Sequence, residues 1–342
     1  MRLATLVTQL RKPRDYDPRE FIATWREKDL LDGKVVDARV IILRTSGCYW
    51  AVRSGCSMCG YVNDTAVAVT PEDLAVQVNA FVNAYQDEPL VKVYTSGNFF
   101  DERELKPESR QLLLKVLGER ADKVIVESLA HLVRPNLVKE GVDAVGKFEV
   151  ALGLESANPT VHRHAVNKPW GIAEHLKAGQ AIHEAGGTVK TYIVVKPPFL
   201  TEREAMLDAV DTAIAADPVS DTTSFNPMNV QSHTLVDHLW RRHEYRPPWL
   251  WTIVEVLRRT AGLKAQRKAH PTAGGMQRGA HNCGTCDRKV MQAIEDYSLN
   301  LRKDLDGLSC TCQEDWQNRL DLEGLMRTSA NLDILLDHGR EA

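Results

Sequence analysis

Six short runs of β-branched and apolar residues recur along the first two thirds of the chain, and segments with helical patterns separate them. Two of these segments begin with helix-start signals: Thr70 is an N-cap followed by proline and two acids, and Thr201 with Glu204 forms a capping box. Repeated alternation of strand and helix predicts parallel strands, in a barrel or an open sheet. The runs are ARVIILRT (38–45), LVKVYTSG (90–97), KVIVES (123–128), FEVALGLES (148–156), TVKTYIVVKPP (188–198) and DTTSFNPMNVQ (221–231).

Polar or glycine-containing sequences follow these runs, and a stretch with three cysteines follows the first of them. Since βα loops gather at the carboxyl edge of a parallel sheet, we expect these segments to surround one mouth. After residue 240 the pattern becomes helical and basic, which we interpret as an extension rather than a seventh barrel unit. The expected division is an N-terminal segment packing on the barrel (1–34), a core (35–240) and a C-terminal extension (241–342).

The composition is that of a globular protein, with 342 residues, 43% of them hydrophobic and 26% charged. No apolar run is long enough to span a membrane, and the N-terminus lacks a secretory pattern. We therefore expect a cytoplasmic protein with reduced thiols. Residues 241–290 hold eleven Lys and Arg against three Asp and Glu, which suggests either a patch for a polyanion or a solvated helical face.

The seven cysteines divide into a group of three, at Cys48, Cys56 and Cys59, and a group of four. Iron–sulfur clusters take about one thiolate per iron, so three thiolates on a four-iron cluster leave one iron open. The other group makes a complete tetrahedral set, for which we favour structural zinc over a second iron–sulfur cluster, with His281 as an alternative ligand. Its members are Cys283, Cys286, Cys310 and Cys312.

The three-cysteine loop after the first strand resembles that of the radical S-adenosylmethionine (SAM) superfamily, whose fold is a partial (β/α)6 TIM-type barrel. The resemblance implies that the three cysteines bind a [4Fe–4S] cluster and that SAM chelates its open iron. The spacing CxxxxxxxCxxC resembles the long loops of the elongator-like branch. Met58 replaces the aromatic residue usual before the last cysteine, which makes Tyr61 a candidate for the adenine contact. We expect residues 49–55 to form an extended lid that carries Tyr49, Trp50 and Arg53.

Three later motifs resemble the SAM-binding motifs of the superfamily. YTSGNFFD (94–101) corresponds to the motif that receives the SAM amino group, VESLAHLVRP (126–135) to the motif after the fourth element, and GLESANPTVHRHAVNK (153–168) to the fifth-strand motif of the elongator-like branch. The cofactor-binding residues that this resemblance implies are Met58, Tyr61, Ser96, Gly97, Asn98, Glu127, Glu155 and Ser156.

Sequences outside the shared core look like those of the archaeal radical SAM family of archaeosine formation, RaSEA. They are YIVVKPPFLTE (192–202), NPMNVQSHTLVDHLW (226–240), YRPPWLW (245–251) and RGAHNCGTCD (278–287). The resemblance implies a lyase that cleaves the lysine C–N bond of a lysine-modified deazaguanine base in tRNA through a 5′-deoxyadenosyl radical, leaving the amidine of archaeosine. It also implies an archaeosine synthase partner that attaches the lysine, together with a one-electron donor.

No protein acid or base is required by this scheme, so no catalytic residue is assigned beyond the cluster ligands. Candidates for substrate binding are Arg134, Arg163, Lys168, Lys196, Asn226, Asn229, Gln231 and His233. Candidates for tRNA contact are Arg258, Arg259, Arg267 and Lys268, near Trp249 and Trp251, for which packing is the commoner role of tryptophan.

Two alternatives remain at this point. One is another radical SAM enzyme of the elongator-like branch that acts on a different RNA or metabolite. The other is a non-catalytic, zinc-dependent nucleic-acid-binding protein in which both cysteine groups are structural.

Overall fold

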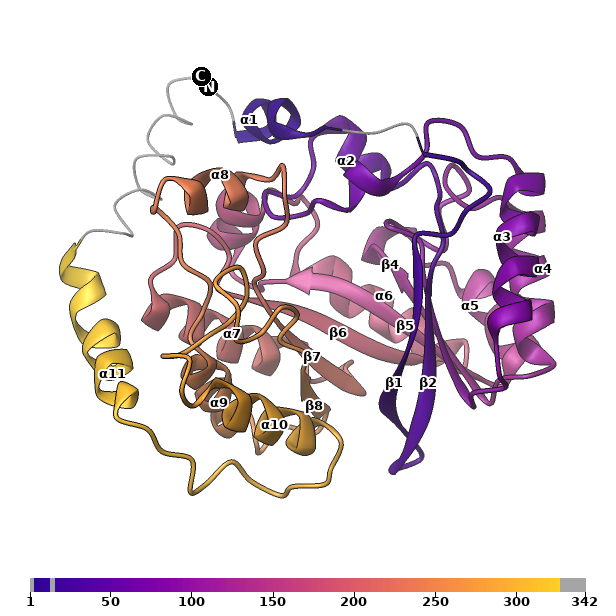
Figure 1. Cartoon of the computed structure of the whole chain (residues 1–342). Coiled ribbons are helices and arrows are strands. Elements are labelled where there is room, and N and C mark those ends of the chain that lie inside the picture. Colours follow the sequence, from indigo (N-terminus) through magenta and orange to yellow (C-terminus); the bar gives the residue numbers. More distant parts are fainter. Residues whose placement is uncertain (1–2, 13–15, 327–342) are drawn as a thin grey trace.

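A curled sheet of eight strands forms the centre of the computed structural model, which describes residues 3–12 and 16–326 (Figure 1). The strands lie in chain order across the sheet. The first pairs antiparallel with the second, and every later neighbour is parallel. The strands are β1 (Ala23–Leu31), β2 (Lys34–Ile42), β3 (Leu90–Tyr94), β4 (Lys123–Ser128), β5 (Lys147–Glu155), β6 (Thr188–Val195), β7 (Thr222–Pro227) and β8 (Gln266–Ala269).

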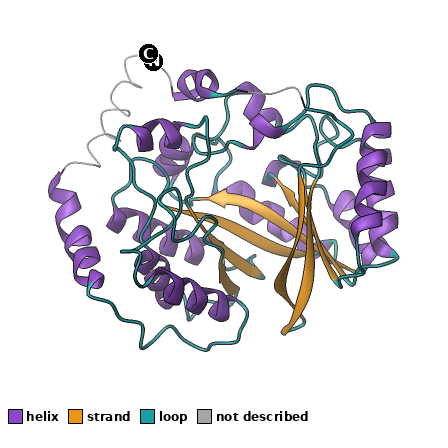
Figure 2. Cartoon of the chain, in the orientation of Figure 1, coloured by secondary structure: helices purple, strands orange, loops and turns teal. Residues whose placement is uncertain are grey.

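Helices connect the parallel strands and cover the outside of the sheet (Figure 2). Thr70 and Asp73 form a capping box at the start of one, and Thr201 and Glu204 form another, as the sequence predicts. The helices are α1 (Leu3–Leu10), α2 (Tyr49–Arg53), α3 (Pro71–Ala84), α4 (Pro107–Gly118), α5 (Pro135–Val145), α6 (Ile172–Glu184), α7 (Glu202–Ala216), α8 (Leu235–Arg241), α9 (Leu250–Arg259), α10 (Asp287–Ser298) and α11 (Cys312–Leu322).

The predicted fold class is confirmed: a partial α/β barrel with a mainly helical C-terminal part that contains a cluster of four cysteines. All six expected strands are present. The sequence reading missed β1, which forms a hairpin with β2 through Asp32 and Gly33, both at positive φ as a two-residue turn requires.

The expectation that no further barrel unit follows residue 240 is wrong, because α9 leads into β8, which pairs in parallel with β7. Both missed strands carry charged residues, which hid the apolar pattern. The division into three domains stays a prediction.

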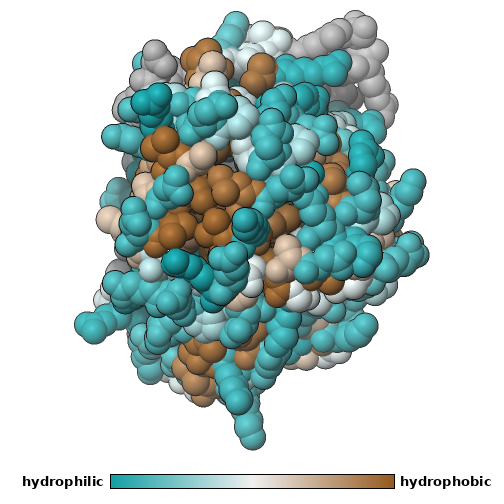
Figure 3. All heavy atoms as spheres, turned by 90° about the vertical axis from the view of Figure 1, so that its right-hand side faces the viewer, coloured by the Kyte–Doolittle hydropathy of each residue, from teal (hydrophilic) through white to brown (hydrophobic). Residues whose placement is uncertain are grey.

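The core lies between the sheet and its covering helices, in two main parts. One packs α3, α4 and α5 against β2 to β5, and the other packs α7, α9 and α10 against β6 to β8. Figure 3 turns the side that carries α3 and α4 toward the viewer, where a hydrophobic area lies within a mostly hydrophilic surface. Among the described helices, none is long and apolar enough to cross a membrane.

Side-chain ion pairs connect the two edges of the sheet inside the barrel. Asp29 of edge strand β1 forms an ion pair with Lys92 of β3 and accepts a hydrogen bond from Lys268 of the opposite edge strand β8. All three side chains are at least 95% buried. Burial opposes ionisation of Asp29, but the lysine ammonium groups outweigh it and hold the pKa of this carboxyl well below its usual value.

A further lysine, Lys190 of β6, lies within the influence of the same buried group of charges. Burial and the nearby ammonium of Lys92 lower the pKa of Lys190 to about 8. Asp29 therefore shares with Glu27 and Glu149 the balancing of these buried cations, and it is the carboxylate that links β1 to β8, which have no backbone hydrogen bonds to each other.

Replacing Asp29 by asparagine should lower the free energy of unfolding by roughly 3–5 kcal/mol, because the buried ammonium of Lys268 loses its counter-ion and that of Lys92 keeps only Glu27. Urea unfolding followed by circular dichroism measures this. The control is Arg259→Gln, which breaks an exposed pair with Glu255 one helical turn away and should change stability by about 0.5 kcal/mol or less. Equal stability of both variants would show that the ion pairs do not hold the barrel edges together.

Candidate active site at the mouth of the half-barrel

The three-cysteine loop follows β2 and lies at the carboxyl end of the parallel strands. Cys48 occupies the N-cap of α2, and Cys56 and Cys59 follow that helix. All three thiols are partly buried. Residues 49–53 form a short helix, so the expectation of an extended lid is wrong.

An aromatic cluster supports this short helix. The Tyr49 hydroxyl is 2.6 Å from His131 Nε2, and the His131 ring stacks on Trp170 with centroids 3.9 Å apart. Trp50 packs edge-on against Trp170, and its indole N–H donates to the Asn167 carbonyl. The rings come from the loops after β2, β4 and β5, so they join three loops of the mouth. Sequence reasoning found neither His131 nor Trp170, because no local pattern pairs residues this far apart.

Two cations lie near the three thiols, and the sequence reading assigned neither to them. Arg11 follows α1, and the Coulombic influence of all three cysteines acts on its guanidinium. Its Nε and Nη2 atoms are buried and have no hydrogen-bond partner within the described residues. Lys168, buried to 96% at its side chain, is under the influence of Cys56 and Cys48.

Burial raises the pKa of Cys48 and Cys56, and it raises that of Cys59 to about 11. Because metals bind the thiolate form, a positively charged surrounding favours a bound cluster over three free thiols. The unpaired guanidinium atoms of Arg11 are what a missing anion would leave, so the residues present fit a thiolate-bound cluster with an anionic ligand.

The loop after β3 is held under Cys48 by a buried carboxyl group. Glu104 accepts hydrogen bonds from the Thr45 hydroxyl at 2.8 Å and from the Asn98 backbone N–H at 2.6 Å. Burial raises the pKa of Glu104 to about 8. A Cβ at Gly97 would lie 2.1 Å from Glu104 Oε2, so only glycine permits this approach.

Asn98 is completely buried, and its side chain connects two other loops. Its Nδ2 lies 3.5 Å from Cys48 Sγ, and its Oδ1 accepts the Leu129 N–H at 2.9 Å. The backbone groups of Asn98 are also bonded, to Glu104 and Asp101. Asn98 therefore positions the cysteine loop. Because its polar groups are already bonded within the protein, Ser96 and Gly97, the two residues before it, remain the predicted contacts of the SAM amino group.

The strands β4 and β5 each place a carboxylate at the mouth. Burial raises the pKa of Glu127 to about 7. Glu155 has a positive φ of 70° and pairs with Lys168 Nζ at 3.0 Å. The predicted cofactor contact of Ser156 is wrong: this residue is fully buried, and its hydroxyl donates to Asp208 of α7, outside the barrel. The positive φ at Glu155 and the register shift beside it explain why the next side chain points away from the mouth.

The last cysteine is held from the opposite side of the mouth. The Gly60 N–H, directly after Cys59, donates to Gln231 Oε1 at 2.6 Å, and Tyr61 lies beside the same glutamine. Tyr61 remains half exposed, whereas Met58 packs on the cluster of apolar residues between β6, β7 and α8. Of the two candidates for the adenine contact, Tyr61 has the accessible ring.

Two of the predicted substrate-binding lysines are engaged within the protein. Lys196 is buried and pairs with Glu202 at 2.5 Å, and Lys168 pairs with Glu155. Because both ammonium groups already have carboxylate partners, neither is free for substrate. Arg134, the N-cap of α5, and Arg163, in a π-helical turn after β5, are exposed. Asn226, Asn229 and His233 are partly buried after or within β7.

Most of the basic side chains that were predicted to contact tRNA form hydrogen bonds or ion pairs within the protein. Lys268 is 4% exposed and pairs with Asp29, so its predicted tRNA contact is wrong. Arg267 donates to the carbonyls of Leu263 and Ala265. Arg258 donates to the Leu305 carbonyl, and Arg259 pairs with Glu255 but is exposed. Trp251 is 2% exposed and packs in the core, as expected for most tryptophans.

The four C-terminal cysteines converge at the N-terminal ends of α10 and α11, where Cys286 is the N-cap of α10 and Cys312 the first residue of α11. Their sulfurs lie within 4.8 Å of one another, with separations of 3.9 Å for Cys283–Cys286, 3.8 Å for Cys283–Cys310 and 3.7 Å for Cys286–Cys312. Zinc–sulfur bonds of about 2.3 Å in a tetrahedron place the sulfurs roughly 3.8 Å apart. The thiols of a multi-iron cluster bind different irons and lie farther apart. The geometry therefore fits a single tetrahedral ion.

Neighbouring donors complete this metal site. The indole N–H of Trp251 donates to Cys312 Sγ at 3.2 Å, and Asn282 Nδ2 donates to Cys286 Sγ at 3.3 Å. Such N–H···S contacts stabilise metal-bound thiolates. His281, the alternative ligand, donates from Nδ1 to the Gly279 carbonyl and is not part of the set of ligand atoms.

Comparison with known proteins identifies the family. Archaeosine synthase subunit beta of Methanosarcina acetivorans is 38% identical over 316 residues, which cover 88% of this chain and 90% of the relative. The protein of the same name from Thermococcus kodakarensis is 38% identical over 86% of this chain and 94% of the relative. The chain belongs to the archaeosine synthase subunit beta family. The family recognised from the sequence motifs is thereby confirmed.

The sequence was also compared with protein-family models, and the structure with solved structures. No protein-family model matches the sequence. Among solved structures, archaeal Elp3 of Methanocaldococcus infernus with an N-terminal deletion has a TM-score of 0.47 and 14% identity, over 67% of this chain and 59% of that chain.

Metal analysis of the family member tests the four-cysteine site. A variant with alanine at Cys48, Cys56 and Cys59 should retain about one zinc ion per chain and no iron, because the second set of thiols is complete by itself. The further change Cys312→Ser should remove the zinc and lower the melting temperature, since this buried sulfur lies in the second part of the core. Retention of iron in the triple-alanine protein would instead assign an iron centre to the four cysteines.

Proposed function

We propose that the chain is a radical SAM enzyme of archaeosine biosynthesis that cleaves the lysine C–N bond of a lysine-modified deazaguanine base in tRNA. The observation that supports this most is the loop of three partly buried cysteines at the mouth, beside the unpaired Arg11 guanidinium, in a chain of this family. When bound, a [4Fe–4S] cluster and SAM would supply a 5′-deoxyadenosyl radical for hydrogen abstraction.

The residues of the mouth have distinct roles in this proposal. Cys48, Cys56 and Cys59 would hold the cluster, while Arg11 and Lys168 offset the negative charge of the thiolates. Ser96, Gly97, Glu127 and Glu155 would hold the amino and ribose groups of SAM, and Tyr61 would contact the adenine.

The aromatic cluster of Tyr49, His131 and Trp170 covers the cysteine loop. It would exclude water and other hydrogen donors from a reactive intermediate, which a radical reaction requires. Asn98 and Gln231 act as positioning residues: Asn98 donates to the Cys48 sulfur and ties it to the loop after β4, and Gln231 holds the backbone N–H next to Cys59.

The tRNA-binding part of the proposal now depends on fewer residues. Arg134 and Arg163 are exposed after β4 and β5, where their guanidinium groups could bind phosphate. Arg259 is exposed on α9, whereas Arg258 and Arg267 are partly used in carbonyl contacts. An archaeosine synthase partner that attaches the lysine and a one-electron donor complete the proposed reaction.

Replacing Cys56 by alanine should abolish reductive cleavage of SAM, because the cluster loses one of its three thiolates. Protein reconstituted without oxygen should bind about four irons at the first loop and form 5′-deoxyadenosine when reduced with SAM. Iron analysis and liquid chromatography measure both. The control Val52→Ala changes an exposed side chain of α2 in the same loop and should keep full cleavage. Cleavage by the Cys56→Ala protein would refute the cluster assignment.

The substrate is tested with tRNA that carries the lysine-modified deazaguanine. Reconstituted protein should convert it to archaeosine, detected by mass spectrometry of tRNA digests, and formation of 5′-deoxyadenosine should rise with this tRNA compared with unmodified tRNA. SAM cleavage without archaeosine would favour another RNA or a metabolite as substrate. Zinc without iron in the reconstituted protein would favour a non-catalytic nucleic-acid-binding protein.

A further inference from the structure

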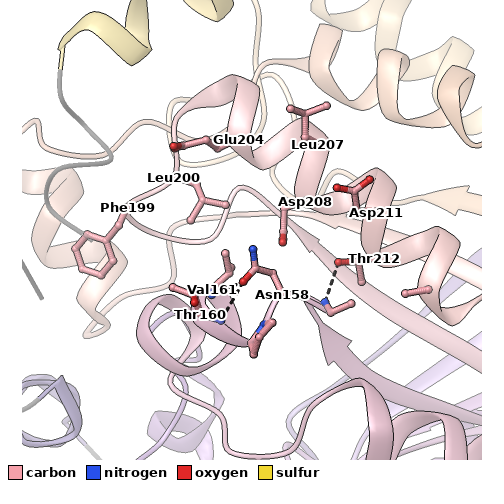
Figure 4. A pocket seen from close by; sticks show the side chains of 13 residues that line it. Asn158, Thr160, Val161, Phe199, Leu200, Glu204, Leu207, Asp208, Asp211 and Thr212 are labelled. Atoms are coloured by element: carbon pink, nitrogen blue, oxygen red, sulfur yellow. Dashed lines mark hydrogen bonds between the residues drawn. The ribbon is translucent and has the colours of Figure 1, made fainter. Parts of the chain in front are cut away.

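A cavity of about 650 Å³ lies outside the barrel, between α7 and the loop that follows β5 (Figure 4). Its volume is that of a site for a small ligand. It is separate from the mouth, because Ser156, the residue before the lining residue Ala157, already points away from the barrel interior, toward α7. Apolar side chains of Phe199, Leu200 and Leu207 form one part of its lining.

Three carboxylates from one face of α7 form another part of the lining. Glu204, Asp208 and Asp211 are spaced by four and three residues, which places them on successive turns of the helix. Glu204 accepts the Thr201 N–H in the capping box, whereas Asp208 and Asp211 are like charges three residues apart, which destabilise a helix unless a cation compensates them. No lysine, arginine or histidine is among the described residues that line the cavity.

Two cations of the segments that flank the lining are paired elsewhere, and Arg163, which comes two residues after the lining residue Val161, is exposed and is not itself part of the lining. Lys196 pairs with Glu202 and Arg203 with Asp321. Within the described residues, the four C-terminal cysteines are the group whose ligand atoms lie close enough together to share a metal ion. The three carboxylates of the cavity do not form such a group. A bare metal ion is therefore a poor fit, and an organic cation with an apolar body suits the lining.

Asp208 contributes an independent observation. The residue is 8% exposed, and its side chain points toward the space above Asn158 (Figure 4). Its Oδ1 accepts the Ser156 hydroxyl at 2.7 Å, but its buried Oδ2 has no hydrogen-bond partner within the described residues. Burial, partly offset by the Ser156 hydrogen bond, raises the pKa of Asp208 to about 6, which shows how little the surroundings stabilise its charge.

The hydrogen bonding of Asp208 also limits the kind of cation. A guanidinium binds a carboxylate best through both oxygens at once, and here the Ser156 hydroxyl already takes one of the two acceptor sites of Oδ1, whereas both sites of Oδ2 are open. A primary ammonium needs only one oxygen and can direct its remaining N–H groups to a second carboxylate or to water.

We propose that this cavity binds a primary alkylammonium group, with the ammonium on Asp208 Oδ2 and near Asp211, and the methylene chain on Phe199, Leu200 and Leu207. The group is carried by a free polyamine or by a lysine side chain of a protein. The carboxylates of the lining disfavour a ligand with its own carboxylate nearby, such as free lysine. The site does not depend on the proposed reaction at the barrel mouth.

Isothermal titration of the full-length, metal-loaded protein with 1,5-diaminopentane tests the site. We expect saturable binding of the diamine and none of 1,5-pentanediol, which has the same chain without charge. Asp208→Asn should weaken diamine binding by about tenfold or more, because a charged hydrogen bond is lost. Asp211→Asn, at an exposed position, provides a second test if the first variant unfolds. The matched control is Glu184→Gln, an exposed carboxylate of α6 outside the cavity, which should leave binding unchanged.

A second titration with Nα-acetyl-lysine N-methylamide distinguishes the sources of the ammonium. Tighter binding of this capped lysine than of the diamine would support a protein side chain as the occupant, and the reverse would support a free polyamine. Absence of saturable binding of both compounds at millimolar concentrations would overturn the proposal. Diamine binding that is unchanged in both aspartate variants would overturn it as well.

Discussion

The buried carboxylate of Asp29 is the interaction on which the barrel most depends. The curled sheet leaves β1 and β8 as edges without backbone hydrogen bonds to each other, and Asp29 connects them through Lys268 while it also pairs with Lys92. Burying these ions is costly, so the network is stable only while the positive and negative groups remain matched. Because the curvature of the sheet brings the carboxyl-end loops together, the geometry of the mouth follows from this closure.

The mouth itself is assembled by contacts between loops rather than within them. Asn98 joins the β3 loop to Cys48 and to the β4 loop, Gln231 holds the residue after Cys59, and the ring of Trp170 packs against α2 and His131. Each contact spans tens of residues in the sequence. Consequently, the positions of the three thiols depend on side chains that are not metal ligands, and these residues would have to stay in place for a cluster to be held.

The outer face of the barrel has a different charge pattern from its interior. Inside, Lys92, Lys268 and Lys168 each have a carboxylate partner. Outside, on α7, the carboxylates of Glu204, Asp208 and Asp211 line a cavity without a cation. Ser156 lies at the boundary between the two sides. The residue before it, Glu155, pairs with Lys168 at the mouth, whereas the Ser156 hydroxyl donates to Asp208 outside the barrel. Adjacent residues of β5 and its loop thus serve opposite sides of the wall.

Local patterns of period, cap and spacing were enough to predict the six parallel strands, the capping boxes at Thr70 and Thr201 and the division of the cysteines into three and four. Which charged side chains are free to bind a ligand became visible from the folded chain alone. The sequence predicted that Lys268 and Lys196 bind a ligand, but both form buried ion pairs. No local pattern pointed to Arg11 and Glu104, yet both lie at the cysteine loop. Strand β8 was missed for the same reason, because its buried Lys268 pairs with Asp29 of β1, which is 239 residues away in the sequence. The physical reason is that pairing of charges depends on closure of the barrel, which spacing along the chain does not encode.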